Sequence, residues 1–262
     1  MIKPTLKDMH QVIAIAKQAG AVIMEIYQRD FTVEYKEDQS PLTEADLASH
    51  LLICDELNIL YPDIPILSEE FTDTFKIEDE NACFWCVDPL DGTKEFIKKN
   101  DEFTVNIALI QNQQPILGVI GVPAKDYIYA AVQGEGAFKQ EGEKELKTIM
   151  VKSQDEDHLT FAVSRSHLDD ETKNMVEEYQ AEMLQAGSAI KLAYVAEGLV
   201  DVYPRFGPTM LWDVAAGQCI IEEAGGKAIW AKNQQPMTYN INHMKNDSFM
   251  AMNAVLKHKV DV

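Results

Sequence analysis

Acidic residues gather in three short segments whose neighbours are apolar. The segments are LSEE at residues 67–70, VDPLDGT at residues 87–93 and LWDVAAG at residues 211–217. Hard divalent cations bind several oxygen ligands, most of them carboxylates. Asp46 adds a candidate ligand from a fourth segment. Because four segments of one chain supply carboxylates of this kind, the sequence predicts a divalent-cation site.

The segment VDPLDGT joins two carboxylates to a tight turn. An apolar strand delivers Asp88 to its end, and Pro89 fixes the backbone direction. Asp91 returns to the same side, and Gly92 lets the main chain approach a ligand closely. Such a turn presents amide N–H groups to an anion while carboxylates hold a cation beside it. The backbone oxygen of Leu90 faces the same point and is a further candidate ligand.

Each segment alone also fits a simpler structure. Asp-Pro and Asp-Gly pairs form ordinary β-turns, and Glu69-Glu70 fits a solvated loop. Asp213 fits a helix N-cap, and TEAD at residues 43–46 fits a capping box. The cation-site hypothesis therefore depends on finding all four segments in one chain.

The elements of the first half indicate helices followed by an antiparallel meander. Apolar residues recur with helical spacing over 5–28, and a second helix begins at Thr43 and stops near Pro62. A break is expected at 40–42 and a turn at 134–136, and no dinucleotide-binding loop is indicated. The predicted strands are 31–35, 64–67, 84–87, 103–110, 116–122 and 127–132. The polar run 140–147 predicts the end of a domain covering residues 1–150, which carries most of the metal ligands.

The second half, residues 151–262, alternates between strands and helices and carries Asp213. The predicted strands are 159–163 and 199–203, and the predicted helices are 169–179, 189–197 and 214–224. Gly225-Gly226 supplies the helix C-terminus. This alternation predicts a layered α/β (α+β) fold.

Composition excludes several classes of function. The formal net charge of −20 over 262 residues disfavours nucleic-acid polymers as partners, although bound cations would still attract a phosphorylated small molecule. Four cysteines are too few for a disulfide framework, and Cys83 and Cys86 lack the partners of a zinc site. No apolar run is long enough to span a membrane, so we expect a soluble, cytoplasmic protein.

The strings DPLDGT (88–93) and WDVAAG (212–217), preceded by Glu69-Glu70, resemble the paired motifs of the lithium-sensitive inositol monophosphatase superfamily. Other strings resemble its CysQ branch, the 3′(2′),5′-bisphosphate nucleotidases: TKEF (93–96), EFTVNIAL (102–109), VSRSH (163–167) and YPRFGP (203–208). The resemblance extends through most of the chain. It implies a layered α-β-α-β-α sandwich and hydrolysis of adenosine 3′,5′-bisphosphate to AMP, with the sulfated analogue as a second substrate and a role in sulfur assimilation.

The resemblance also implies which residues bind metal. Glu69, Asp88 and the Leu90 carbonyl would hold one Mg²⁺. Asp88, Asp91 and Asp213 would hold a second, with Asp88 bridging the two. Two metals would neutralise the phosphate dianion and stabilise the leaving oxygen in an in-line displacement.

Catalytic roles follow from the same resemblance. Gly92 and Thr93 would offer N–H groups to the scissile phosphate, and the Thr93 hydroxyl and Glu69 would orient and deprotonate the attacking water. Asp46 would support the Thr93 hydroxyl or a third Mg²⁺.

The substrate's second phosphate requires a partner that a monophosphate does not. Lys191 follows Gly187-Ser188 in a predicted helix, and Arg205 lies in a proline-stiffened segment eight residues before Asp213. With Ser188 they are the candidates for the 5′-phosphate. The full substrate-binding set is then Glu69, Leu90, Asp91, Gly92, Thr93, Ser188, Lys191, Arg205 and Asp213.

Two other functions remain open from the sequence. One is a broader inositol or sugar phosphatase of the same superfamily, and the other is a non-catalytic, metal-dependent nucleotide-binding protein. The choice between monomer and homodimer is undecided, and loose attachment to the cytoplasmic side of the inner membrane stays an alternative to a free cytoplasmic location.

Overall fold

A computed structural model describes residues 2–35, 41–75, 77, 79, 81–152, 158–166, 168–254 and 256. Its larger sheet has the strand order β3-β4-β5-β6-β7-β8-β9, in which only β3 and β4 run parallel. The strands are β3 (Ile66–Ser68), β4 (Phe84–Asp91), β5 (Thr104–Gln111), β6 (Gln114–Val122), β7 (Tyr127–Val132), β8 (Gly136–Glu141) and β9 (Lys147–Ile149). The central strands are buried on both faces, which explains their nearly continuous apolar sequences.

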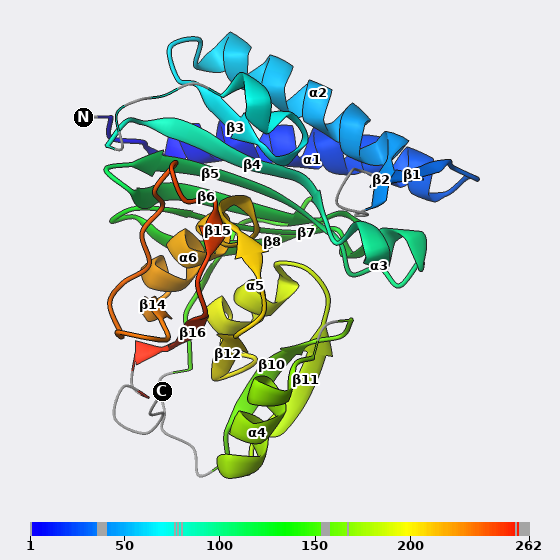
Figure 1. Ribbon diagram of the computed structural model, residues 1–262. Helices are drawn as coiled ribbons and strands as arrows, with labels where there is room; N and C mark the ends of the chain where they lie inside the picture. The colour runs from blue at the N-terminus through cyan, green and yellow to red at the C-terminus, as the bar shows by residue number, and fades with distance from the viewer. Residues whose placement is uncertain are drawn as a thin grey trace.

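Two long helices cover one face of this sheet (Figure 1). They are α1 (Leu6–Tyr27) and α2 (Glu44–Leu60). Each begins at a capping box, in which a threonine and an aspartate three residues later satisfy backbone N–H groups reciprocally, and the second box pairs Thr43 with Asp46. The apolar side chains of both helices join Trp85 and Val87 of β4 in one core cluster. Between the helices, β1 (Val33–Tyr35) and β2 (Pro41–Thr43) form a short antiparallel pair.

The opposite face packs against α5 (Ile190–Ala196) and α6 (Leu211–Glu223). Helix α6 lies so close to β6 that a side chain at Gly118 would place Cβ 2.4 Å from the carbonyl oxygen of Ala216. Only glycine fits there, because that contact is with backbone rather than with a flexible side chain.

A second, smaller sheet lies beyond α5 and α6 (Figure 1). Its order is β11-β10-β12-β16-β14, and α4 (Asp170–Glu178) covers its outer face. The strands are β10 (Thr160–Ser164), β11 (Glu182–Ala186), β12 (Val202–Arg205), β14 (Gly226–Trp230) and β16 (Phe249–Asn253). The layers therefore follow the order α-β-α-β-α. The remaining elements are η1 (Glu69–Thr74), α3 (Thr93–Ile97), η2 (Pro123–Lys125), β13 (Thr209–Met210) and β15 (Lys245–Asn246).

The sequence predictions of a layered fold, of both N-terminal helices and of the meander are confirmed. Four local predictions were wrong. Pro41 and Leu42 belong to a strand rather than a break, the polar run 140–147 overlaps β8 and β9, the strand predicted at 199–203 begins at Val202, and α6 begins at Leu211 rather than Val214. The domain division at residue 150 stays a prediction. No helix among the described residues has both the length and the apolar character needed to cross a membrane.

Candidate active site

The carboxylates of Asp88 and Asp91 meet at the end of β4. The register between β4 and β5 shifts between these two residues, so that the strand bulges where they stand. The backbone N–H of Leu90 donates to Asp88 Oδ1 at 3.1 Å, which turns the Leu90 peptide toward the aspartate. The chain then turns at Gly92, whose φ of +92° favours glycine.

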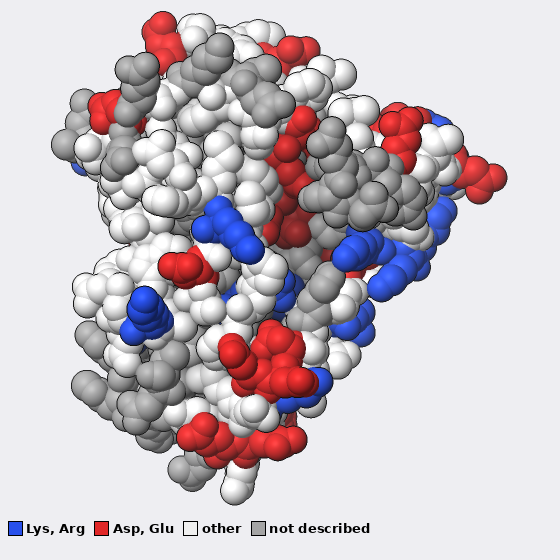
Figure 2. All heavy atoms as spheres, viewed as in Figure 1, with Lys and Arg blue, Asp and Glu red and all other residues white. Residues whose placement is uncertain are grey.

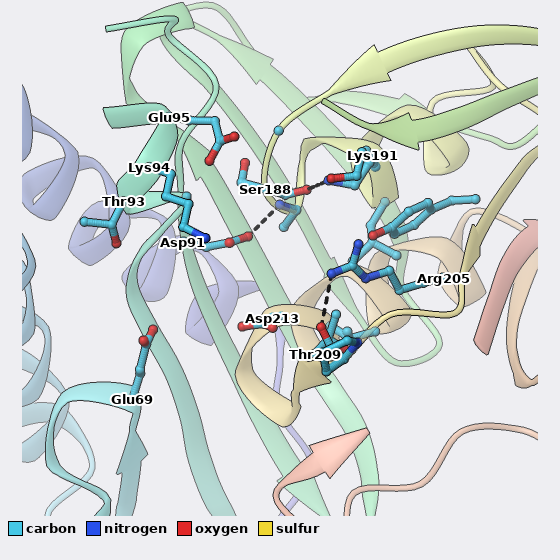
Figure 3. Close-up of a pocket in the computed structure, with 18 of the residues that line it drawn as sticks. Glu69, Asp91, Thr93, Lys94, Glu95, Ser188, Lys191, Arg205, Thr209 and Asp213 are labelled. Atoms are coloured by element: carbon cyan, nitrogen blue, oxygen red, sulfur yellow. Dashed lines mark hydrogen bonds between the residues drawn. The ribbon is translucent and has the colours of Figure 1, made fainter. Parts of the chain in front are cut away.

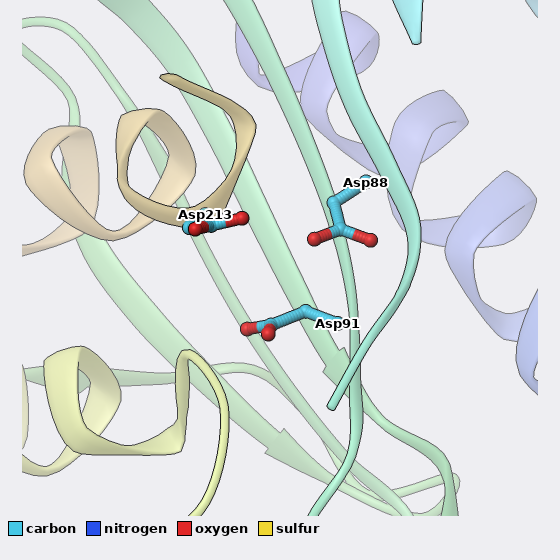
Figure 4. Close-up of side chains that lie close together, drawn as sticks. All are labelled: Asp88, Asp91 and Asp213. Carbon is cyan, nitrogen blue, oxygen red and sulfur yellow. The ribbon is translucent and has the colours of Figure 1, made fainter. Parts of the chain in front are cut away.

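Helix α6 brings a third carboxylate to the same point. Asp213 lies in the first turn of α6 and accepts a hydrogen bond from the backbone N–H of Met210 at 2.8 Å. It is therefore inside the helix rather than at its N-cap. Oxygen atoms of Asp88, Asp91 and Asp213 all lie within 4.8 Å of one another (Figure 4).

The electrostatics of this cluster favour a bound cation. Burial, reinforced by the charges of Glu69, Asp91 and Asp213, raises the pKa of Asp88 well above its usual range. Burial likewise raises the pKa of Asp91 to about 6, against the opposing effect of the Lys191 cation. Burial and the charge of Asp91 raise the pKa of Asp213. Asp88 is buried and Asp91 and Asp213 are partly buried. These three carboxylates oppose one another's ionisation and form an all-oxygen donor set that fits a hard divalent cation.

Thr93 lies beside the cluster and is held by Asp46. The Thr93 hydroxyl donates to Asp46 Oδ1 at 3.1 Å and has a second, weaker contact with the Leu90 carbonyl at 3.4 Å. The other oxygen of Asp46 accepts from the backbone N–H and the hydroxyl of Thr43 at 2.8 and 2.6 Å. Asp46 therefore uses one oxygen to begin α2 and the other to orient the Thr93 hydroxyl.

The loop between β11 and α5, which belongs to the second sheet's side of the fold, contacts the carboxylate cluster. The backbone N–H of Ala189 donates to Asp91 Oδ2 at 2.6 Å. Lys191 is buried and donates to the carbonyls of Ser188 and Ala186 at 2.6 and 3.3 Å. Burial lowers the pKa of Lys191 to about 8 although the charge of Asp91 opposes this shift. The lysine thus fixes the loop and also places a positive charge near the carboxylates.

A cavity of about 370 Å³ opens above these groups. Figure 3 shows Glu69 and Thr93 on one side of it and Arg205 on the other, with Asp91 and Asp213 between them. In Figure 2, acidic side chains line a hollow near the centre of the visible face, with Lys and Arg beside it. The cavity lining includes Glu69, Asp91, Gly92, Thr93, Lys94, Glu95, Ser164, Ser188, Lys191, Tyr203, Arg205 and Asp213.

Two polar groups in the cavity wall have no hydrogen-bond partner among the described residues. They are the hydroxyl of Ser188 and Nε of Arg205, both buried at the atom. Another guanidinium nitrogen, Nη2, donates to the Pro208 carbonyl at 3.1 Å, which anchors the arginine. Buried polar atoms are nearly always hydrogen-bonded in folded proteins, so these groups are candidates to bind a ligand.

The predicted site residues come together in this structure. Eight of them line the cavity directly: Glu69, Asp91, Gly92, Thr93, Ser188, Lys191, Arg205 and Asp213. Asp46, Asp88 and Leu90 do not line it, being only 1–2% exposed. The roles assigned to all of these residues stay predictions. Sequence reasoning assigned no role to Lys94, Glu95 or Ser164, although the strings TKEF and VSRSH contain them.

The chain belongs to the Inositol monophosphatase family, whose profile matches residues 6–258. The family is metal-dependent, in agreement with the acidic cluster. A similar curated protein is the 3′(2′),5′-bisphosphate nucleotidase CysQ of Salmonella typhimurium, which is 44% identical over 221 residues, covering 83% of this chain and 88% of that protein. The CysQ of Aggregatibacter actinomycetemcomitans is 38% identical over 251 residues, covering 95% and 91%.

Solved structures give the same answer for the fold. CysQ from Bacteroides thetaiotaomicron, described as a bacterial member of the inositol monophosphatase family, has a TM-score of 0.81 and 38% identity, covering 94% of this chain and 97% of that one. The IMPase of Thermotoga maritima has a TM-score of 0.77 and 26% identity, covering 94% and 91%.

Proposed function

We propose that this protein is a Mg²⁺-dependent 3′(2′),5′-bisphosphate nucleotidase that converts adenosine 3′,5′-bisphosphate to AMP and phosphate. The observation that carries the proposal is the convergence of Asp88, Asp91 and Asp213 within 4.8 Å. The cluster adjoins a cavity in a chain 44% identical to a protein named as such a nucleotidase. We propose that each active site binds two Mg²⁺ ions, or three. We also propose that the sulfated analogue of adenosine 3′,5′-bisphosphate is a second substrate.

The acidic cluster would hold the metal, and neighbouring groups would position the reactants. When bound, the metal neutralises the phosphate dianion and lowers the pKa of the attacking water. Because the Thr93 hydroxyl donates its proton toward Asp46 Oδ1, its oxygen is oriented to accept a hydrogen bond from that water. Glu69 faces the same space (Figure 3) and is the candidate to accept the water's proton. The N–H groups of Gly92 and Thr93 are the candidates to bind the scissile phosphate.

The opposite wall supports a substrate with a second phosphate. Arg205 carries a positive charge there with Nε unpaired among the described residues, and the unpaired Ser188 hydroxyl belongs to the same cavity. A guanidinium binds phosphate through charge-assisted hydrogen bonds that a single-phosphate substrate does not need. Lys191 would contribute by its charge, since its Nζ already donates to two backbone carbonyls.

A panel of substrates tests the proposed function. We expect Mg²⁺-dependent phosphate release from adenosine 3′,5′-bisphosphate, with much lower rates for AMP, inositol 1-phosphate and fructose bisphosphate. Chelator should abolish the activity, and Li⁺ should inhibit it. A preference for inositol 1-phosphate would replace the nucleotidase proposal with the inositol phosphatase alternative. Full activity in chelator, or no release from any of the four compounds, would refute the metal-dependent enzyme.

Replacing Arg205 should separate substrates by their number of phosphates. Arg205→Ala should lower kcat/KM for adenosine 3′,5′-bisphosphate by roughly 1–3 kcal/mol, the worth of a charge-assisted hydrogen bond. Adenosine 3′-monophosphate should be nearly unaffected, because it lacks the 5′-phosphate. Arg205→Lys should restore only part of the loss, since lysine lacks the planar fork. Steady-state kinetics on both substrates decide the point, and equal losses would remove Arg205 from the 5′-phosphate site.

A further inference from the structure

A buried carboxylate joins the two halves of the chain at one edge of the active-site cavity. Glu102, which is 9% exposed, precedes β5 of the larger sheet. Its Oε2 accepts from Nε of Arg165 at 2.6 Å and from the backbone N–H of Gly187 at 2.8 Å, and its Oε1 accepts from Nη2 of Arg165 at 2.8 Å. Such a bidentate pair fixes the direction of both side chains as well as their distance.

Arg165 also binds the segment that Glu102 holds. Arg165 follows β10 of the smaller sheet, and its Nη2 donates to the Gln185 carbonyl at 3.0 Å. Its backbone N–H donates to the Ala186 carbonyl at 3.3 Å. The end of β11 is therefore tied to Arg165, and the next residue, Gly187, is tied to Glu102.

The loop held in this way touches the acidic cluster two residues later. Ala189 donates its backbone N–H to Asp91 Oδ2 at 2.6 Å, the shortest of the hydrogen bonds that this carboxylate accepts from described residues. Gly187 packs closely against the larger sheet's side of the cavity, because a Cβ there would lie 2.7 Å from both the Glu102 carbonyl oxygen and Glu95 Cγ. Because only Ser188 separates Gly187 from Ala189, a displacement of Gly187 would also move the Ala189 N–H.

We infer that Arg165 and Glu102 are positioning residues that hold the 187–189 loop so that its Ala189 N–H orients Asp91 for metal binding. The inference rests on the proposed function only in that Asp91 is taken as a metal ligand. Both residues lie in strings that the sequence singles out, EFTVNIAL and VSRSH, and neither has a role in the proposed chemistry. Removing a group that hydrogen-bonds to a metal-ligating side chain and orients it typically lowers metal affinity or activity by roughly 10–100-fold.

Simple stabilisation of the fold is the competing explanation, and the chain offers a matched control. Asp201 is a buried carboxylate that accepts from Lys152 Nζ at 3.0 Å and from the Thr160 N–H at 2.8 Å, so it too combines a cation with a backbone donor. Neither Asp201 nor Lys152 lines the cavity. Lys152→Ala should therefore lower stability without weakening metal binding.

The test compares Arg165→Ala, Arg165→Lys and Glu102→Gln with Lys152→Ala. Electron paramagnetic resonance measures Mn²⁺ binding. The Mn²⁺ affinity should fall about tenfold or more in Arg165→Ala and should recover in part in Arg165→Lys. Amide hydrogen exchange at Ala189 should accelerate in the metal-free Arg165→Ala protein and stay unchanged in Lys152→Ala. The Mg²⁺ concentration for half-maximal phosphatase activity should rise in parallel, while kcat at saturating Mg²⁺ changes less.

Glu102→Gln should also weaken Mn²⁺ binding, and it serves as the second variant if Arg165→Ala does not fold. The effects of Glu102→Gln and Arg165→Ala should not add in the double variant, because both act through one contact. Unchanged Mn²⁺ affinity and unchanged Ala189 exchange, with a loss of thermal stability like that of Lys152→Ala, would overturn the inference. Mn²⁺ binding and amide exchange need no substrate, so they decide the inference even if the nucleotidase proposal fails.

Discussion

Asp88→Asn should abolish phosphate release while leaving the fold intact. Asp88 is the candidate bridging ligand, so one lost charge would weaken both proposed metal sites. Metal assistance supplies several kcal/mol of charge stabilisation, and a loss of about 4 kcal/mol lowers kcat roughly a thousandfold. Steady-state assays at saturating Mg²⁺ measure the change, with circular dichroism to verify the fold. Retention of more than about a tenth of the parent kcat would contradict a bridging role.

The same variant should be more stable than its parent when metal is absent. Burial raises the pKa of Asp88 in the folded state, and burial raises the pKa of Asp91 to about 6, from the ordinary aspartate value of 3.8. A group with a raised folded pKa contributes stability below its unfolded pKa, and this contribution is lost as pH rises through the folded pKa. The metal-free parent should therefore lose stability between about pH 4 and pH 7.

Urea denaturation in chelator at pH 5 and pH 7.5 measures this effect. Asp88→Asn removes one of the opposing charges, so its loss of stability between the two pH values should be smaller than that of the parent. Equal losses in the two proteins would mean that the clustered carboxylates do not repel one another in the metal-free state.

Gly118→Ala should be the most destabilising single-methyl change in the larger sheet. The new Cβ would lie 2.4 Å from the Ala216 carbonyl oxygen and 3.0 Å from Cys219 Cβ, so β6 and α6 would have to separate. Overpacking of this kind costs about 3 kcal/mol, which lowers Tm by roughly 6–12 °C in a chain of this size. Activity should also fall, because α6 carries Asp213.

Gly121→Ala on the same strand is the control. Its Cβ would have ordinary contacts, the nearest at 3.4 Å from Ile128 Cδ1, on the side that faces Ala16 of α1. Thermal denaturation should show little change for this variant. A similar Tm for the two variants would mean that the contact between α6 and β6 relaxes without cost.

The sequence predicted the grouping of the carboxylates because each follows or begins a recognisable element. Asp88 ends an apolar run and Asp213 lies in the first turn of a helix, and the ends of packed elements meet at the edges of layers. The sequence did not predict that Lys191 would be buried beneath its own loop. The helical pattern indicates α5, but the orientation of a seven-residue helix depends on its tertiary packing.

The strands that escaped prediction are those without an apolar alternation. Strand β11, EMLQA, lies at the edge of its sheet and is mostly exposed, so its position depends on pairing with β10 rather than on burial. Strand β8 is likewise held by its ladder with β7. Strand β16 is buried throughout, and a five-residue apolar run of this kind does not distinguish a strand from part of a helix.

The wide spacing of the three clustered carboxylates along the chain bears on how the protein is made. Asp88 and Asp91 belong to the larger sheet, whereas Asp213 arrives with α6, after most of the chain has been translated. At roughly 5–20 residues per second, the ribosome delivers Asp213 several seconds after Asp91. A nascent chain therefore holds an incomplete set of ligands throughout that interval, and tight capture of cations must wait until α6 has docked on β6.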